Sequence, residues 1–174
     1  MQNRTLRQLT AAGVIAAAYA ALSLVLAPIT FGPVQCRISE ALTLLPVISP
    51  AAIWGVTLGC AVTNGVGAAT GANFLGLVDL LVGTAATLLA AVATRLLGKC
   101  RFGGLPWLSA LPPILINAVA IGGEWCYAMT GSINGAFWVF AGQIALGQLP
   151  PCLLGVWLVG LLERRSLQTI IEGK

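Results

Sequence analysis

Long apolar stretches dominate the chain, and charged or turn-forming residues separate them. A transmembrane helix needs about 20 consecutive apolar residues, and four stretches are long enough to cross a bilayer. These four stretches are residues 9–26, 74–94, 105–129 and 135–162. We therefore predict a membrane-spanning helix in each of them.

The stretch 38–66 is harder to assign because Pro46 and Pro50 interrupt it. Proline ends or kinks a helix, so this stretch is either one interrupted span or two short ones. As an α-helix, residues 39–48 would be about 15 Å long against a hydrocarbon core of about 30 Å. In transporters, short or broken segments of this kind lie at binding sites, where protein or a water-filled cavity covers their polar backbone. The alternative is an interfacial or re-entrant hairpin with a structural role.

The positive charges decide between these two interpretations. Eight of the nine Lys and Arg residues fall in three clusters along the chain. The clusters contain Arg4 and Arg7, then Arg95, Lys99 and Arg101, then Arg164, Arg165 and Lys174. The positive-inside rule places all three in the cytoplasm, which requires an even number of crossings between neighbouring clusters. Two crossings within 38–66 satisfy this requirement and one does not.

The predicted fold is therefore an all-α integral membrane protein. It is a six-helix transmembrane bundle with short or broken second and third helices and both termini in the cytoplasm. The whole chain, residues 1–174, is expected to form this single transmembrane domain.

Composition supports the membrane assignment and argues against several other classes. The chain is 58% hydrophobic and 8% charged, whereas soluble domains are roughly 25% charged. The net charge of +4 does not indicate nucleic-acid binding, because the cations lie beside apolar segments and form no basic face. There is no histidine, and the five cysteines form no CxxC pair, so neither a metal nor a cofactor is expected. Without a nucleophile motif or a complete Walker A motif, the chain is not expected to be an enzyme or to bind ATP.

Four charged residues remain when the three cation clusters and the terminal acids Glu163 and Glu172 are set aside, namely Arg37, Glu40, Asp79 and Glu124. An ionised side chain costs about 2.5 to 3.5 kcal/mol at the centre of a transmembrane helix, so these residues should face a cavity, the bundle interior or each other. The predicted topology puts the three carboxylates at one level in the extracellular half. One arginine and three acids sum to −2, which favours uptake of protons or of a cation. Alternatively, Arg37 and Glu40 form a self-contained pair at a helix end.

Polar amides and indoles accompany these charges in otherwise apolar helices. They are Asn64, Asn117, Gln143, Gln148, Trp54, Trp125 and Trp138. Carboxylates accept hydrogen bonds from ring N–H and amino groups, and an amide can serve a ring carbonyl, so the set suits a flat polar heterocycle. For each residue alone, the alternative is interhelical packing or an aromatic belt at the membrane interface.

The first predicted helix carries two rows of small residues spaced four apart. One row is Ala12, Ala16 and Ala20, and the other is Gly13, Ala17 and Ala21. Small residues at this spacing let helices approach closely. The neighbour is either another helix of the same chain or another protein.

Four segments between positions 31 and 124 carry a family resemblance. FGPVQCRISEALTLLP, LGCAVTN, LVDLLVGTAATLLAA and LPPILINAVAIGGE together resemble the QueT-type substrate-binding subunits of energy-coupling factor (ECF) transporters. The resemblance implies a six-helix S component in the plasma membrane of a prokaryote that binds a queuosine precursor, such as queuine or an aminomethyl-deazaguanine base. It also implies a transmembrane T subunit and two ATPase subunits as partners. These partners would dock mainly on the first helix of this chain, at Ala12, Ala16, Ala20, Gly13 and Ala17.

For such a substrate, we expect Glu40 and Asp79 to carry most of the recognition. Glu124 would meet the amine or the base edge, and Arg37 would hold Glu40 or touch the ring carbonyl. The other predicted substrate contacts are Asn64, Asn117, Trp125, Trp138 and Gln143. Two of these, the asparagines, would orient the ring.

A second function is also compatible with the residues. Asp79 and Glu124 can form a proton relay, because ionisable residues inside membranes often do so. The chain would then be a self-sufficient, proton-coupled secondary transporter of a small polar or cationic heterocycle.

Overall fold

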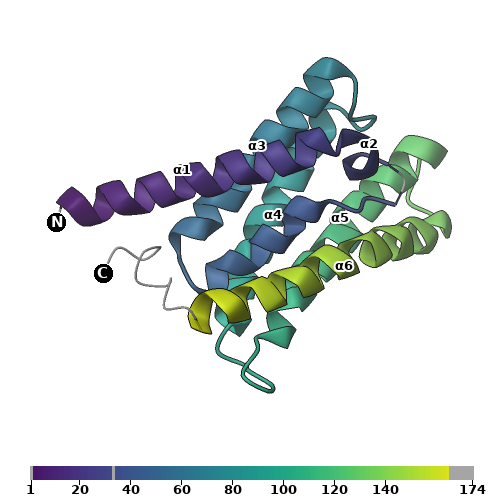
Figure 1. Ribbon diagram of the computed structural model, residues 1–174. Helices are drawn as coiled ribbons and strands as arrows, with labels where there is room; N and C mark the ends of the chain where they lie inside the picture. Colours follow the sequence, from purple (N-terminus) through teal and green to yellow (C-terminus); the bar gives the residue numbers. More distant parts are fainter. Residues whose placement is uncertain (1, 33, 165–174) are drawn as a thin grey trace.

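The computed structural model describes residues 2–32 and 34–164, and this part of the chain is a bundle of helices without a β-sheet (Figure 1). The helices are α1 (Gln2–Val25), α2 (Ala27–Thr30), η1 (Ile38–Val47), α3 (Ala51–Thr70), α4 (Leu77–Leu97), η2 (Trp107–Ala110), α5 (Leu111–Thr130) and α6 (Ala136–Arg164). Within these described residues, five segments are long and apolar enough to cross a membrane, as expected of a multi-pass helical membrane protein. Two members of the third cation cluster, Arg165 and Lys174, lie outside the described residues.

The ends of the long helices follow from local sequence. α3 and α5 stop where Gly71 and Gly131 adopt the left-handed conformation, with φ of 72° and 73°. Glycine takes this conformation without the steric cost that a Cβ brings, so it commonly ends helices. α5 begins at Leu111 and carries Pro112 and Pro113 in its first turn, which tolerates proline because its N–H groups have no partner within the helix.

The short segment Ile38–Val47 is a 3₁₀ helix and not the α-helix assumed in the length estimate. A 3₁₀ helix rises about 2.0 Å per residue, so these ten residues cover about 20 Å instead of about 15 Å. η1 packs against α1, α3, α4 and α6, and most of its side chains are buried. The protein therefore covers its backbone, as expected for a short helix at membrane depth and unlike an interfacial hairpin.

Contacts between α1 and α3 give the direction of the chain. A Cβ added to Gly55 would lie 2.8 Å from the Cβ of Ile15, and one added to Gly59 would lie 2.6 Å from the Cβ of Tyr19. Residue numbers rise together along both helices, so α1 and α3 run parallel. The chain between them, which includes η1, therefore returns to the end of the bundle where α1 begins (Figure 1).

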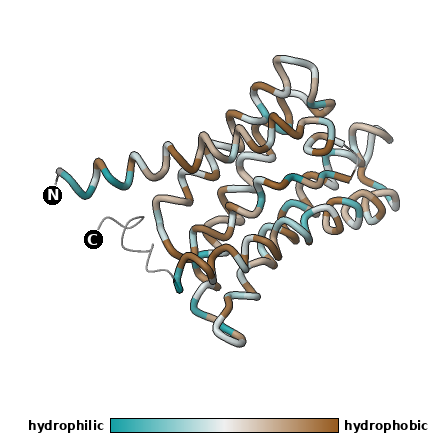
Figure 2. Tube along the Cα trace, in the orientation of Figure 1, coloured by the Kyte–Doolittle hydropathy of each residue, from teal (hydrophilic) through white to brown (hydrophobic). Residues whose placement is uncertain are grey.

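The remaining long helices pack in chain order around η1. α3 contacts α4, α4 contacts α5 and α5 contacts α6, while α6 also packs on η1. The largest buried apolar cluster joins η1 to α6 through Leu44, Leu45, Cys152 and Val156. Figure 2 shows apolar residues along the length of the bundle and hydrophilic residues at the beginning of α1. Many large apolar side chains face outward, such as Leu81 at 72% exposure, as a bilayer requires.

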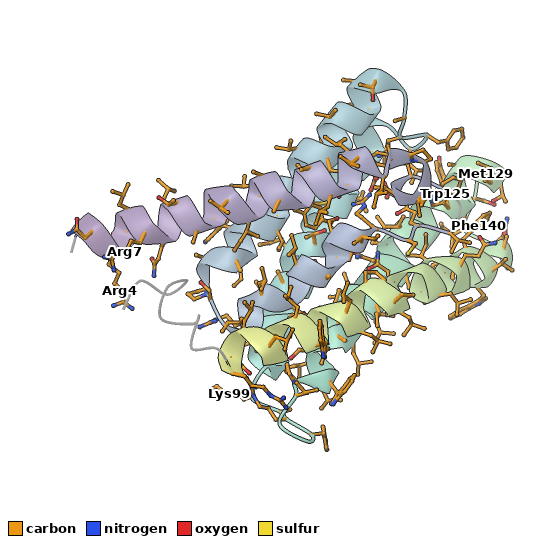
Figure 3. The ribbon with its side chains drawn as sticks, in the orientation of Figure 1. Arg4, Arg7, Lys99, Trp125, Met129 and Phe140 are labelled. Atoms are coloured by element: carbon orange, nitrogen blue, oxygen red, sulfur yellow. The ribbon has the colours of Figure 1, made fainter. Side chains whose placement is uncertain are left out.

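The described cations of the three predicted clusters gather at one end of the bundle. Arg4, Arg7 and Lys99 lie toward the end where the chain begins (Figure 3). At this end the Arg95 guanidinium donates to the carbonyl of Pro46 (2.8 Å), and Arg101 makes a two-fold hydrogen-bonded ion pair with Glu163 (2.5 and 2.7 Å). An even number of crossings between neighbouring cation clusters requires the clusters to share one end of the bundle, as their described members do here. The assignment of this charged end to the cytoplasm stays a prediction.

Candidate substrate-binding site

Arg37, Glu40 and Asp79 meet in the interior of the bundle, near the end opposite the charged end. Their exposed fractions are 5%, 1% and 1%. Arg37 precedes η1 in an extended conformation, Glu40 lies in the first turn of η1, and Asp79 lies in the first turn of α4. Packing of η1 against α4 thus brings together three charges that the sequence separates by up to 42 positions, from 37 to 79.

Arg37 pairs with Asp79 and not with Glu40. Its Nη2 lies 3.9 Å from Asp79 Oδ2 and donates to Asn64 Oδ1 at 3.2 Å. The guanidinium also lies 5.6 Å from the centre of the Phe31 ring, a cation–π geometry. Within the described residues, the self-contained pair of Arg37 and Glu40 does not form. That alternative is therefore wrong, because α3 and α4 supply better-placed partners.

Each buried carboxylate uses one oxygen and leaves the other unpaired. The Tyr19 hydroxyl donates to Glu40 Oε1 (2.6 Å), and the Asn73 amide donates to Asp79 Oδ2 (2.7 Å). Glu40 Oε2 and Asp79 Oδ1 are buried without a hydrogen-bond partner, and so are the donors Arg37 Nε and Gln35 Nε2. Buried polar groups nearly always have partners. Two free acceptors and two free donors in one region therefore point to a polar ligand.

A small cavity of about 10 Å³ lies among these groups. Its lining residues are Gln35, Arg37, Glu40, Gly83, Thr87, Asn117, Ile121 and Gln148. They come from the residues before η1 and from η1, α4, α5 and α6. The cavity has room for about one water molecule, so a bicyclic base enters only if the lining helices separate.

Asn64 and Asn117, both predicted to orient a ring, differ in position. Asn64 accepts from Arg37 and donates to the backbone carbonyl of Asp79 (2.9 Å), so its polar groups hold the two charged residues in place. Asn117 is 4% exposed and lines the cavity. Asn117 can therefore touch a ligand directly, whereas Asn64 positions the residues that do.

Glu124, Trp125 and Gln143 form a second group near the same end of the bundle. Both carboxylate oxygens of Glu124, Nε1 of Trp125 and Oε1 of Gln143 are buried without hydrogen-bond partners. Trp125 stacks with Phe74 and with Phe140, whose ring centres lie 5.6 and 6.4 Å from its own. Figure 3 shows Trp125 and Phe140 at the end of the bundle opposite Arg4, Arg7 and Lys99.

Trp138 lies outside both groups. Its side chain is 77% exposed and its ring meets Phe137 edge-on at 5.1 Å. Trp54 is also exposed, at 62%. These positions fit the aromatic belt that was the alternative interpretation for a single tryptophan.

Several residues that complete the central site were not predicted from the sequence. Tyr19 and Asn73 come from segments without a predicted ligand contact, whereas Gln35 lies two positions before the predicted contact Arg37. Tyr19 is the only aromatic residue of the alanine-rich first helix, and Asn73 lies between two glycines that bound a loop. These two features of the sequence are the signals that could have identified Tyr19 and Asn73. The described residues contain no group of three or more His, Cys, Asp or Glu side chains placed to hold a metal ion.

A helical membrane bundle with a polar site enclosed between its helices is typical of membrane transport proteins. The family model described as QueT transporter matches residues 9–164. The chain belongs to this family, and the match includes the first helix and the last helix, beyond the segments that carried the resemblance. No curated protein and no solved structure matches the chain. Because the family is one of transporters, membership favours transport over enzymatic catalysis.

Proposed function

We propose that the chain is the substrate-binding S subunit of an ECF-type importer that takes up a queuosine precursor, either queuine or a related deazaguanine base. The observation that carries the proposal is the set of four unpaired buried atoms in a bundle of the QueT transporter family. A deazaguanine base has ring N–H and amino groups that donate to carboxylates. It also has a carbonyl that accepts from a guanidinium or an amide.

The unpaired atoms suggest how the base binds. Glu40 Oε2 and Asp79 Oδ1 accept from the N–H and amino groups of the base. Arg37 Nε and Gln35 Nε2 donate to its carbonyl and to a ring nitrogen. Asn117 contacts the ring from α5. Tyr19, Asn64 and Asn73 bind the other polar atoms of the same carboxylates and guanidinium, which keeps the free atoms oriented.

The proposal includes the topology and the partners. The chain crosses the plasma membrane of a prokaryote six times, with η1 as the second crossing and both termini in the cytoplasm. A T subunit and two ATPase subunits supply the energy of transport, and this chain binds no ATP. On α1, Gly13 and Ala17 are exposed and offer the docking face, while Ala12 and Ala20 are buried.

Titration of the detergent-solubilised chain with queuine and with the aminomethyl-deazaguanine base tests the substrate. We expect one-to-one binding without nucleotide. Glu40→Gln should weaken it about ten-fold to one hundred-fold, since hydrogen bonds to charged groups contribute about 1.5 to 3 kcal/mol. Glu163→Gln, at the charged end, is the matched control and should bind as the wild type does.

Two outcomes would contradict the proposal. Absence of both heat and a thermal shift with either compound would remove the substrate assignment. Uptake into proteoliposomes by the chain alone, driven by a pH gradient, would instead support the proton-coupled secondary transporter.

A further inference from the structure

Both carboxylate oxygens of Glu124 are buried without a hydrogen-bond partner, and within the described residues no ion pair reaches them. Among the described Lys and Arg residues, Arg37 is the one placed away from the charged end, and it is held by Asp79 and Asn64. An uncompensated buried charge is strongly unfavourable. Glu124 therefore requires either a proton or a positive charge from outside the chain.

The position of Glu124 connects it to the central cavity. Ile121 lines that cavity, and Glu124 follows three residues later on α5, about 4.5 Å along the helix axis and away from the charged end. On α6, Gln148 lines the cavity and Gln143 lies five residues earlier, also away from the charged end. The helices touch at this level, because a Cβ on Gly122 would lie 2.7 Å from Ala141 Cα. Glu124 and Gln143 thus lie about one helical turn beyond the central site.

The residues at the level of Glu124, where Gly122 of α5 meets Ala141 of α6, suit a cationic group that is partly apolar. Phe74 and Phe140, which together with Trp125 are here called the aromatic stack, each lie nearly parallel to the Trp125 ring, at interplanar angles of 22° and 23°. Aromatic faces attract ammonium groups. The Gln143 carbonyl oxygen adds a second unpaired acceptor. Two carboxylate oxygens, an amide oxygen and aromatic rings together match the three N–H donors and methylene group of an alkylammonium.

We propose that Glu124, Gln143 and the aromatic stack form a second subsite that binds an alkylammonium arm of the substrate and selects for its positive charge. This inference rests on the proposed function, because the arm belongs to the base held in the central site. In an aminomethyl-deazaguanine, the ammonium lies at the opposite end of the bicycle from the amino group of the pyrimidine ring. A base with its amino edge at Glu40 and Asp79 therefore directs the arm toward Glu124.

The test compares a charged arm with a neutral arm on the same base. Aminomethyl-deazaguanine and cyano-deazaguanine are titrated into the wild type, Glu124→Gln and Glu124→Asp. We expect the wild type to bind the aminomethyl base at least ten-fold more tightly than the cyano base. Glu124→Gln should lose this preference while its affinity for the cyano base stays within about two-fold. Glu124→Asp keeps the charge and should retain most of the preference, and Glu163→Gln should retain all of it.

Equal affinity of the wild type for the two bases would overturn the subsite, and so would an undiminished preference in a folded Glu124→Gln. If neither base binds the wild type, the proposed substrate fails and the subsite is tested by itself with benzylammonium and benzyl alcohol. Stabilisation by benzylammonium alone, absent in Glu124→Gln, would still support the subsite. No difference between the two probes would overturn it. Size-exclusion chromatography and the thermal midpoint establish that each variant is folded.

Discussion

Gly83 has no side chain, and the space that a side chain would occupy is filled by Asp79 and Asn64. A Cβ at position 83 would overlap Asp79 Oδ1 and would lie 2.8 Å from Asn64 Nδ2. Asp79 Oδ1 is one of the two free acceptors of the central site. A glycine on this face of α4 therefore lets the carboxylate lie against its own helix, next to the cavity that Gly83 lines.

Gly83→Ala should weaken binding of the deazaguanine base at least ten-fold, because the new methyl group displaces Asp79 and breaks its alignment with Arg37. In an exposed helix the same change would stabilise by up to about 1 kcal/mol. Isothermal titration measures the affinity. Gly65→Ala is the matched control, since the nearest atom to its Cβ would be Leu80 Cδ1 at 3.9 Å. Wild-type affinity in Gly83→Ala would mean that binding does not depend on the position of Asp79.

The first helix uses its two rows of small residues differently. Ala12 and Ala20 are buried, at 7% and 8% exposure, and α1 packs against α3 through Gly55 and Gly59. Gly13 and Ala17 face outward. The buried row thus packs within the chain, and the outward-facing residues remain available to the proposed T subunit. Tyr19, on the buried side, connects this helix to Glu40.

Ala17→Leu should reduce co-purification with the T and ATPase subunits while leaving ligand affinity within about two-fold, because the added bulk points away from the site. Ala20→Leu should lower both, since extra methylene groups in a packed interior typically cost about 1 to 3 kcal/mol and disturb the neighbouring Tyr19. Pull-down with a tagged T subunit and a ligand titration measure the two effects. Normal assembly of Ala17→Leu would place the docking surface elsewhere.

The whole molecule is polarised along the bundle axis. The cations of the charged end, including Lys99 and Arg101, lie beside the returning end of η1, and the polar site lies near the other end. Parallel packing of α1 and α3 makes this possible, because η1 brings the chain back before α3 starts. An apolar surface with cations at one end favours one orientation in a membrane by the positive-inside rule.

Cysteine labelling checks that orientation. Cys100 is exposed at the charged end, and Ser132 lies in the exposed turn between α5 and α6 at the other end. In a Cys36→Ser background, a membrane-impermeant maleimide should label Cys100 in inverted vesicles but not in intact cells. Ser132→Cys, with Cys100→Ser added, should show the reverse. Labelling of Cys100 in intact cells would invert the proposed topology, and labelling of both positions from one side would contradict the crossing count.

The main features of the fold are predictable from the sequence because they depend on local properties. An apolar stretch predicts a membrane helix wherever it occurs, so the predicted stretch 135–162 corresponds to Ala136–Arg164, and 74–94 corresponds to Leu77–Leu97. The high cost of a charge in the bilayer singles out Arg37, Glu40 and Asp79 before any contact is known. The positions of the cation clusters predict that they lie at one end of the bundle, because an even number of membrane crossings separates neighbouring clusters and returns the chain to the same side.

Contacts between distant elements depend on how the helices pack, and the sequence alone could not give them. Nothing near Arg37 in the chain indicates that Asp79, 42 positions later, is its partner, or that Tyr19 donates to Glu40. The 3₁₀ form of Ile38–Val47 also depends on its neighbours, since the surrounding helices bury it. The same apolar pattern is compatible with Trp138 facing lipid or facing a ligand, and the rotation of α6 against α5 places it outside. Local chemistry therefore identifies the charged groups, while packing determines which of their atoms are left free for a ligand.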